Sequence, residues 1–294
     1  MKGWFSILNL KKISGVLLSC VMAGALFTGC VNEVSTNDPA STRIGIISKL
    51  NISEEILNNH LKKLEAVVSR PGINFSHNFH YYDSINSLLM GIQSNQIDEI
   101  STYKCVANYT IERNPDLELL NHTVNMFDSF CCAVRKDDKS LLESLDSAIL
   151  SMQNDGTLEN LTKTYITDLK GDTEPPAVEL PKIDGADTIK VGVTGDLPPL
   201  DLILADGKPA GFNTAVLAEI SKRINKNIEL VQIEGNARAT ALVTGKIDVV
   251  FWITVPDEFW NKADDAPSDI DKPNELEVTL PYYKDEIVHI GLKK

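Results

Sequence analysis

Basic residues are scarce in this chain of 294 residues, which carries 28 lysines and arginines against 41 aspartates and glutamates, a formal net charge of −13. Proteins that bind nucleic acids or anionic lipid surfaces do so through clusters of basic side chains that neutralise phosphate groups. The sequence has no such clusters, so it disfavours nucleic acid as a partner. The surplus of acidic side chains also favours a soluble surface.

Cysteine is sparse as well, with five residues in the chain. Two of them lie near the N-terminus, and the remaining three, Cys105, Cys131 and Cys132, are an odd set that does not imply a disulfide framework. No Cys-x-x-Cys pair suggests zinc. We expect buried free thiols at Cys131 and Cys132. The histidines His77 and His80, set among aromatic residues, are expected on a surface loop, so neither a metal site nor a cofactor is predicted.

Catalytic motifs are also missing. The sequence contains no Gly-x-Ser-x-Gly, no His-Glu-x-x-His and no glycine-rich loop of the kind that holds phosphate. No nucleophile with an adjacent base stands out either. We therefore expect a binding protein rather than an enzyme, and an extracellular hydrolase is the least supported alternative.

Long hydrophobic runs are limited to one, at the N-terminus. Lys2, Lys11 and Lys12 precede an uncharged stretch from Ile13 to Gly29. The stretch ends in Phe-Thr-Gly-Cys at residues 27–30, which resembles a bacterial lipoprotein cleavage box, although Leu is more usual at the first position. A small-residue cleavage site favours a removed signal, residues 1–29, over a permanent membrane span.

A lipid on Cys30 would then hold the mature chain on the extracellular face of a bacterial cell membrane. Removal of residues 1–29 takes away three lysines and no acidic residue, which leaves 25 basic and 41 acidic residues and a net charge of −16. The alternative is an uncleaved anchor helix in which Cys30 is an ordinary buried thiol. In either case the rest of the chain lies outside the cell, where cytosolic cofactors and ATP are absent.

Beyond a polar tether at residues 30–42, the chain shows a similar pattern twice. Short apolar strands at 43–47 and 189–193 are each followed later by a helix that runs through a Gly or Asn into a second strand, at 85–97 and 239–250. Repeated strand–helix–strand units predict a sheet covered by helices. Between the two copies, residues 171–187 are rich in proline, glycine and acidic residues and read as a linker.

These segments carry a family resemblance. The pieces VGVTGDLPPL, ADGKPAGFNTAVLAEISKRIN, NARATALVTGKIDVV and LPYY resemble, in this order, the first lobe of the extracellular solute-binding proteins of polar amino-acid ABC transporters. The resemblance implies an α/β fold of the type II periplasmic binding protein kind. Such a fold has two lobes, each a mixed sheet flanked by helices, joined by crossing strands.

Residues 43–168 resemble the remainder of the same fold, so that the end of the fold precedes its beginning. The resemblance therefore suggests a circular permutation with these parts: lobe 2 at 43–124, the C-terminal part of lobe 1 at 125–170, the linker at 171–187, the N-terminal part of lobe 1 at 188–283, and a strand returning to lobe 2 at 284–294. Termini that lie close together at a surface tolerate such rearrangement. A tandem of two degenerate copies is the alternative.

In the resembled family, an arginine holds the ligand carboxylate, acidic residues hold the ammonium, and aromatic residues flank the side chain. This sequence departs at each point: Asn213 and Tyr103 stand at the acidic positions, Leu200 stands at an aromatic one, and no arginine follows the strand at 247–250. An amine without a matching carboxylate is costly to bind in a dry cleft. An ordinary α-amino acid is therefore disfavoured as the ligand.

Other residues are candidates for the ligand site. Trp252 is expected to form a stacking wall or to lie in the core. Thr254 and Asp257 are expected to contact the ligand or to cap the next turn, and Arg238 is expected to bind an anionic group or to form a surface ion pair. The full set of ligand-site candidates is Trp252, Asn213, Tyr103, Thr254, Asp257, Ser48, Arg238, Asp196 and Leu200.

The sequence as a whole predicts a lipid-anchored solute-binding protein that captures a small amino-acid-like or other polar molecule between two lobes and delivers it to an ABC permease. The alternative function is a cell-surface sensor or protein-interaction module built on a degenerate binding-protein fold.

Overall fold

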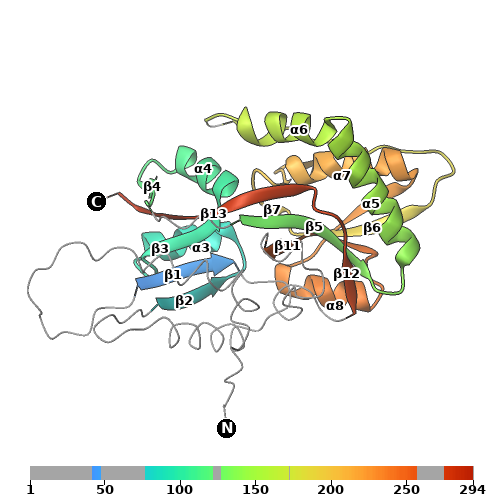
Figure 1. The fold of residues 1–294 in the computed structure, drawn as a ribbon. Coiled ribbons are helices and arrows are strands. Elements are labelled where there is room, and N and C mark those ends of the chain that lie inside the picture. The colour runs from blue at the N-terminus through green and yellow to red at the C-terminus, as the bar shows by residue number, and fades with distance from the viewer. Residues whose placement is uncertain (1–41, 48–76, 122–126, 172, 257–274, 294) are drawn as a thin grey trace, which may run out of the picture.

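The computed structural model describes residues 42–47, 77–121, 127–171, 173–256 and 275–293 (Figure 1). The predicted signal segment, Cys30, nearly all of the tether, Ser48 and Asp257 lie outside these ranges. Within these ranges, no helix is both long enough and apolar enough to cross a membrane.

Ten of the described strands form one continuous mixed sheet, and β7 (Asp196–Leu197), β8 (Asp201–Ile203) and β9 (Pro209–Ala210) form a separate three-stranded sheet. Hydrogen bonding follows the order β10, β6, β11, β5, β13, β3, β1, β2, with β12 added on β5 and β4 added on β13. Figure 1 shows the strands and their helices in two groups, which we name lobe 1 and lobe 2. The expected two-lobe mixed α/β fold is therefore confirmed.

Lobe 1 contains a sheet covered on both faces. Its elements are β5 (Phe127–Arg135), β6 (Thr188–Val193), β10 (Asn227–Gln232), β11 (Val249–Pro256), β12 (Leu276–Val278), α5 (Lys139–Asn154), α6 (Thr157–Thr162), α7 (Phe212–Ile224) and α8 (Arg238–Val243). The strands β10 and β11 flank β6 in parallel, and β5 runs antiparallel to β11. We call the two sides of this sheet the α5–α7 face and the α8 face.

Lobe 2 repeats this strand order. Its elements are β1 (Thr42–Ile47), β2 (His77–Tyr82), β3 (Glu99–Tyr103), β4 (Leu117–Leu119), α3 (Ile85–Gln93) and α4 (Lys104–Arg113). The strands β2 and β3 flank β1 in parallel, as β10 and β11 flank β6. The strand β13 (Tyr283–Leu292) runs antiparallel to β3 and takes the place that β5 has in lobe 1.

Two strands connect the lobes. The first half of β13, Tyr283–Glu286, pairs with β5, and its second half pairs with β3 and β4 of lobe 2. The expected pairing of the C-terminal strand with the lobe built from residues 43–124 is thus present. The described part of the linker, 171 and 173–187, contains no helix and no strand beyond an isolated bridge between Ala177 and Ala210 of β9.

The sequence repeat corresponds to a repeated corner. In lobe 2 the Asp98 N–H donates to the Arg43 carbonyl at 2.8 Å, and the Asp98 carboxylate accepts from the Arg43 N–H at 2.8 Å. In lobe 1 the Asp248 N–H donates to the Lys190 carbonyl at 2.8 Å, and its carboxylate accepts from the Lys190 N–H at 2.9 Å. Asp98 therefore joins β1 to the start of β3, and Asp248 joins β6 to the start of β11.

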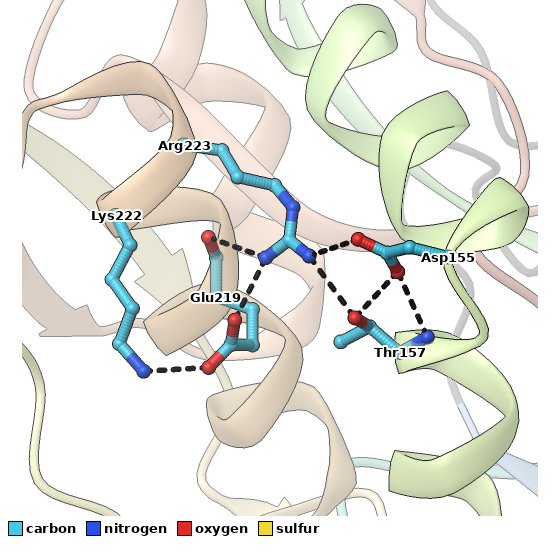
Figure 2. A network of polar contacts seen from close by, with 5 residues as sticks. All are labelled: Asp155, Thr157, Glu219, Lys222 and Arg223. Atoms are coloured by element: carbon cyan, nitrogen blue, oxygen red, sulfur yellow. Dashed lines mark hydrogen bonds and ion pairs between the residues drawn. The ribbon is translucent and has the colours of Figure 1, made fainter.

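The helices on the α5–α7 face are joined by a polar network (Figure 2). Gly156, with a φ of 78°, separates α5 from α6. Arg223 of α7 bonds to the carboxylates of Asp155 and Glu219 at 2.8 and 2.7 Å, and the Asp155 carboxylate also accepts from the Thr157 hydroxyl. These bonds fix α7 to the corner between α5 and α6.

Two expectations about cysteine and histidine have different outcomes. Cys131 and Cys132 are buried free thiols, as expected, and so is Cys105; burial raises the pKa of all three. The expectation that His77 and His80 lie on a surface loop is wrong, because both belong to strand β2. The alternating aromatic residues of that segment pair with β1 instead.

Candidate functional site

A β-bulge in β11 determines which side chains face the region between the lobes. Phe251 pairs with Cys132 and Ile253 pairs with Cys131, so Trp252 is an extra residue. Val249, Phe251 and Trp252 lie on the α5–α7 face, whereas Val250, Ile253 and Val255 pack on the α8 face. Two consecutive residues, Phe251 and Trp252, therefore lie on one side of the sheet.

Trp252 sits at this bulge in a strained conformation. Its φ of 59° lies in the left-handed region, which a bulky side chain rarely adopts. The side chain is 9% exposed and packs near Phe130, with ring centroids 6.2 Å apart. Its indole nitrogen is buried and has no hydrogen-bond partner among the residues that the structure describes. Strained residues of this kind concentrate at functional sites.

Arg238 is buried directly against Trp252. Only 1% of the residue is exposed, so the alternative expectation of a surface ion pair is wrong. Its guanidinium carbon lies 4.3 Å from the centroid of the Trp252 ring, and its Nη1 donates to the carbonyls of Trp252 and Phe251 at 2.9 and 3.3 Å. The arginine therefore bonds to the backbone of the bulge itself.

Tyr103 and Thr254 form a polar contact between the lobes. The hydroxyl of Tyr103, the last residue of β3 in lobe 2, lies 3.2 Å from Oγ1 of Thr254 and 3.2 Å from Oδ2 of Asp128. Both Thr254 and Asp128 are buried. Phe130 lies opposite Thr254 on β5, and its ring centroid is 4.7 Å from that of Tyr103. Four predicted site residues, Tyr103, Arg238, Trp252 and Thr254, thus meet at the boundary between the lobes.

Two other predicted residues lie inside lobe 1. Asn213 is buried in the first turn of α7, where its Oδ1 accepts from the Tyr282 hydroxyl at 3.1 Å and its Nδ2 has no partner in the described part of the chain. Leu200 is fully buried in the main hydrophobic cluster. Leu200 therefore packs against protein in this structure, rather than forming an exposed wall.

A cavity of about 450 Å³ lies beside this cluster, between the lobes. Its lining residues are Asp83 and Ser84 of lobe 2, which follow β2, and Thr194, Asp196, Gln232, Ile233, Glu234 and Gly235 of lobe 1, which lie at or after the ends of β6 and β10. In an α/β sheet, ligands bind where strands end in this way. None of these lining residues is basic, and three carry a carboxylate.

Asp196 is the predicted site residue that lines the cavity. Burial raises its pKa, and the nearby charge of Arg238 partly opposes that rise. Asp201, which is buried behind it, accepts from the N–H groups of Thr194 and Gly195 at 2.9 and 3.0 Å. These bonds fix the backbone at the rim of the cavity. Across the described ranges, no group of three His, Cys, Asp or Glu side chains is placed to hold a metal ion.

A second hollow, of about 570 Å³, lies between α5 and α7. Serines of α5 and Arg223 line it, and all of its lining residues belong to lobe 1. None of the predicted site residues lines it. The hollow between the lobes is therefore the better candidate.

The sequence did not identify several residues of this region. Asp128 and Phe130 come from the crossing strand, and Asp83, Gln232 and Glu234 come from the cavity rim. One signal was available: Asp128 and Ser129 lie in an otherwise apolar strand, where polar residues are buried only for a reason. Ser48 and Asp257, also predicted, fall outside the described residues.

Comparison with known proteins finds a family model that matches one part of the chain. Residues 189–258, which run from β6 to the end of β11, match the family model of the bacterial extracellular solute-binding proteins, family 3. No curated protein matches the sequence of the chain.

Several solved structures align with most of this chain at low sequence identity. The ligand-binding core of GluR0, in complex with L-glutamate, has a TM-score of 0.41 at 9% identity, over 88% of this chain and 87% of that one. A putative methionine-binding lipoprotein from Bacillus subtilis has a TM-score of 0.41 at 9% identity, and the alignment covers 86% of this chain and 83% of that one. The ligand-binding component of an ABC-type import system from Staphylococcus aureus, with zinc bound, has a TM-score of 0.40 at 11% identity. The alignment covers 86% of this chain and 66% of that protein, so this chain spans just under two thirds of that protein's length.

The family match covers the segment that contributes Arg238, Trp252 and Thr254 to the boundary between the lobes. The resemblance to the bacterial extracellular solute-binding proteins of family 3 is therefore confirmed over residues 189–258.

Proposed function

We propose that this protein captures a small polar solute between its two lobes and delivers it to an ABC importer. One observation supports the proposal above the others. The segment that matches the solute-binding family supplies Arg238, Trp252 and Thr254 at the lobe boundary, beside a cavity of about 450 Å³ lined from both lobes. A cleft closed by hinged lobes is a common way to enclose a ligand.

The charge of the cavity bears on the class of solute. Asp83, Asp196 and Glu234 line it, and no lining residue is basic. Arg238, whose Nε lies 3.5 Å from the carbonyl of the lining residue Gly235, donates to the carbonyls of Phe251 and Trp252. A solute with a net negative charge would meet like charges there, so the solute is neutral or cationic.

The proposal includes a lipid anchor on Cys30, for which the Phe-Thr-Gly-Cys sequence at 27–30 is the support. A lipid there would place the cleft on the outer face of the cell membrane, next to the permease. Mass spectrometry of the N-terminal peptide of the membrane-bound protein should show a chain that begins at Cys30 and carries the added mass of a lipid. A peptide that still contains residues before Cys30 would instead support an uncleaved anchor helix.

The proposal also includes a circular permutation. Its support is the matching strand order of the lobes, in which lobe 2 lacks a crossing strand of its own until the C-terminal strand β13 supplies it. A tandem of two copies would have no reason to share strands in this complementary way.

The transport function is tested by thermal unfolding of the chain without residues 1–29 in the presence of solutes of matched size and different charge. A solute that binds the folded protein stabilises it by mass action, by about 2.7 kcal/mol at a concentration of 100 times Kd. Cationic and neutral solutes should raise Tm, and anionic ones should not. The control variant Asp196→Asn should weaken the effect of the cationic solutes more than that of the neutral ones.

A sensor or interaction module remains the second candidate. It is favoured by the tight packing at the site, where Leu200 and Arg238 are almost fully buried and Arg238 covers the Trp252 ring. If no solute of any charge raises Tm, transport is contradicted and this second candidate is preferred.

A further inference from the structure

The bulge in β11 controls more than the position of Trp252. In a regular strand, side chains alternate between the two faces, and a shift by one residue turns every later side chain to the other face. Without the bulge, Thr254 would point to the α8 face, which is lined by apolar residues such as Cys131, Ala133 and Leu242. The bulge therefore brings Thr254 within 3.2 Å of the Tyr103 hydroxyl of lobe 2.

The bulge is costly in two ways. A left-handed conformation at a bulky residue such as Trp252, with its φ of 59°, is unfavourable. A bulge also disrupts the hydrogen-bonded ladder between its strands, here between Phe251 and Ile253. Another group must compensate for these costs.

Arg238 supplies that compensation. Its Nη1 donates to the carbonyls of the two residues at the bulge, at 3.3 Å for Phe251 and 2.9 Å for Trp252. Its guanidinium also stacks on the Trp252 ring at 4.3 Å, an arrangement that is favourable where water is excluded. One buried side chain thus contacts the backbone and the ring of the strained residue.

The same arginine reaches the rim of the cavity. Its Nε lies 3.5 Å from the carbonyl of Gly235, a residue that lines the cavity. Its positive charge is buried near the carboxylates of Asp196 and Asp201, and these acidic groups offset the cost of burying a cation. Arg238 therefore connects the cavity rim to the bulge.

We propose that Arg238 is a positioning residue that holds the β11 bulge, and through it directs Trp252 and Thr254 toward the boundary between the lobes. Its effect on solute binding rests on the proposed function. Its effect on the conformation of Trp252 does not. The two can therefore be tested separately.

The conformational test uses Trp252 as its own reporter. The sequence has three tryptophans, of which Trp4 lies in the predicted signal. In the chain without residues 1–29 that also carries Trp260→Phe, Trp252 is the only indole. Arg238→Met removes the N–H donors but keeps an apolar side chain of similar length. Arg238→Lys keeps the positive charge but not the planar guanidinium. In both variants, acrylamide quenching of Trp252 should increase about twofold and its emission should shift to the red, because the ring is released from its packing.

A matched control and a rescue separate positioning from general loss of stability. Arg223→Met, which removes an arginine from the network in Figure 2, should leave the quenching of Trp252 unchanged. In Arg238→Gly, millimolar ethylguanidinium should restore low quenching, whereas the neutral isostere ethylurea should not. Unchanged quenching in Arg238→Met and Arg238→Lys would overturn the proposal, and equal rescue by both additives would reduce Arg238 to a space-filling role.

A second measurement keeps the proposal testable if an Arg238 variant folds poorly. Glycine adopts a left-handed φ without strain, so Trp252→Gly should remove the need for the compensation. The decrease in Tm caused by Arg238→Met should then be smaller in the Trp252→Gly background than in the parent chain. Equal decreases in the two backgrounds would contradict the proposal. If Arg238 positions Trp252 but no solute in the panel binds, the transport function fails while the positioning role stands.

Discussion

The two lobes contain the same corner, built from equivalent residues. Gly45 in β1 lies under Ile97, and Gly192 in β6 lies under Ile247: a Cβ atom on either glycine would approach the isoleucine Cδ1 to 2.4 or 2.5 Å. Each isoleucine is followed by the aspartate that joins the first strand to the third. The shared parts show that this corner is a structural unit, since it is retained in both lobes regardless of the site.

The lobes differ in the segment immediately after the corner. In lobe 2, β3 ends at Tyr103 and α4 begins at the next residue. In lobe 1, β11 continues through the bulge at Trp252 to Pro256. The candidate site therefore lies where the two repeats diverge. Tyr103 comes from the shorter strand, β3, and Thr254 comes from the longer strand, β11.

The charged partners of the two corners differ as well. Asp98 pairs with Arg43 of its own lobe's first strand at 2.6 Å. Asp248 pairs at 3.1 Å with Arg135, which lies on the crossing strand β5 and also donates to the Ile247 carbonyl at 2.8 Å. The corner of lobe 1 is therefore fastened to a crossing strand, and β5 moves with lobe 1.

The largest effect is expected from removal of β13. If the chain is permuted, lobe 2 is incomplete without this strand, because β3 and β4 both pair with it. A chain that ends at Tyr282 should therefore lose protection from hydrogen exchange throughout residues 77–119. A tandem of two copies predicts the opposite result, in which the residues of lobe 2 stay protected after the truncation.

A smaller effect is expected from the isoleucines of the two corners. Ile97 and Ile247 are 1% and 0% exposed, so replacement of either by Ala leaves a cavity in a packed core. Each replacement should lower the free energy of unfolding by about 3 kcal/mol, and each Ile→Val control by about 1 kcal/mol. Denaturant unfolding measures both. Widely different losses at the two positions would show that the corners are alike in geometry but not in energetic importance.

The smallest effect concerns the helix layer of lobe 1. Hydrogen bonds from Thr157 and Arg223 lower the pKa of Asp155 to about 2. Because the pKa is lowered in the folded state, this stabilisation is complete above the ordinary aspartate pKa and is lost as pH falls from about 4 toward 2. The Tm of Asp155→Asn should thus be lower than that of the parent chain at pH 5, with a difference that disappears near pH 2.

Salt provides the control for this last prediction. The pair of Asp155 and Arg223 is largely exposed on the aspartate side, so high ionic strength should reduce the difference in Tm at pH 5. A difference that does not depend on pH would mean that Asp155 acts as an uncharged cap of α6 and not through its charge.

Much of the fold was predictable because its signals are local. The strands at 43–47 and 189–193 and the helices after them follow from hydrophobic period and from residue types that favour particular backbone angles. The buried state of Cys131 and Cys132 followed from their apolar neighbours. The segment with His77 and His80 was misjudged because its strand is stabilised by pairing with β1, which is distant in sequence.

The site was harder to predict, since its geometry depends on register between distant strands. Trp252, Thr254, Tyr103 and Arg238 were all named from the sequence, but not the contacts among them. The burial of Arg238 follows from the bulge, and the bulge appears in the sequence only as two adjacent aromatic residues, Phe251 and Trp252, that break an alternating pattern. Whether these residues bind a solute stays a prediction.

The pairing of the crossing strands has a mechanical consequence. Four residue pairs, from Tyr283 opposite Phe130 to Glu286 opposite Phe127, join β5 and β13 where the lobes meet. The strand β11 pairs with the other edge of β5 at Asp128, Ser129 and Phe130, so the ribbon that spans the boundary has three strands. Such a ribbon twists more readily than it lengthens, because lengthening breaks its backbone bonds. Relative movement of the lobes should therefore be a rotation about this ribbon. The hydrogen bond between the Tyr103 hydroxyl and Thr254 must break before the lobes rotate away from each other.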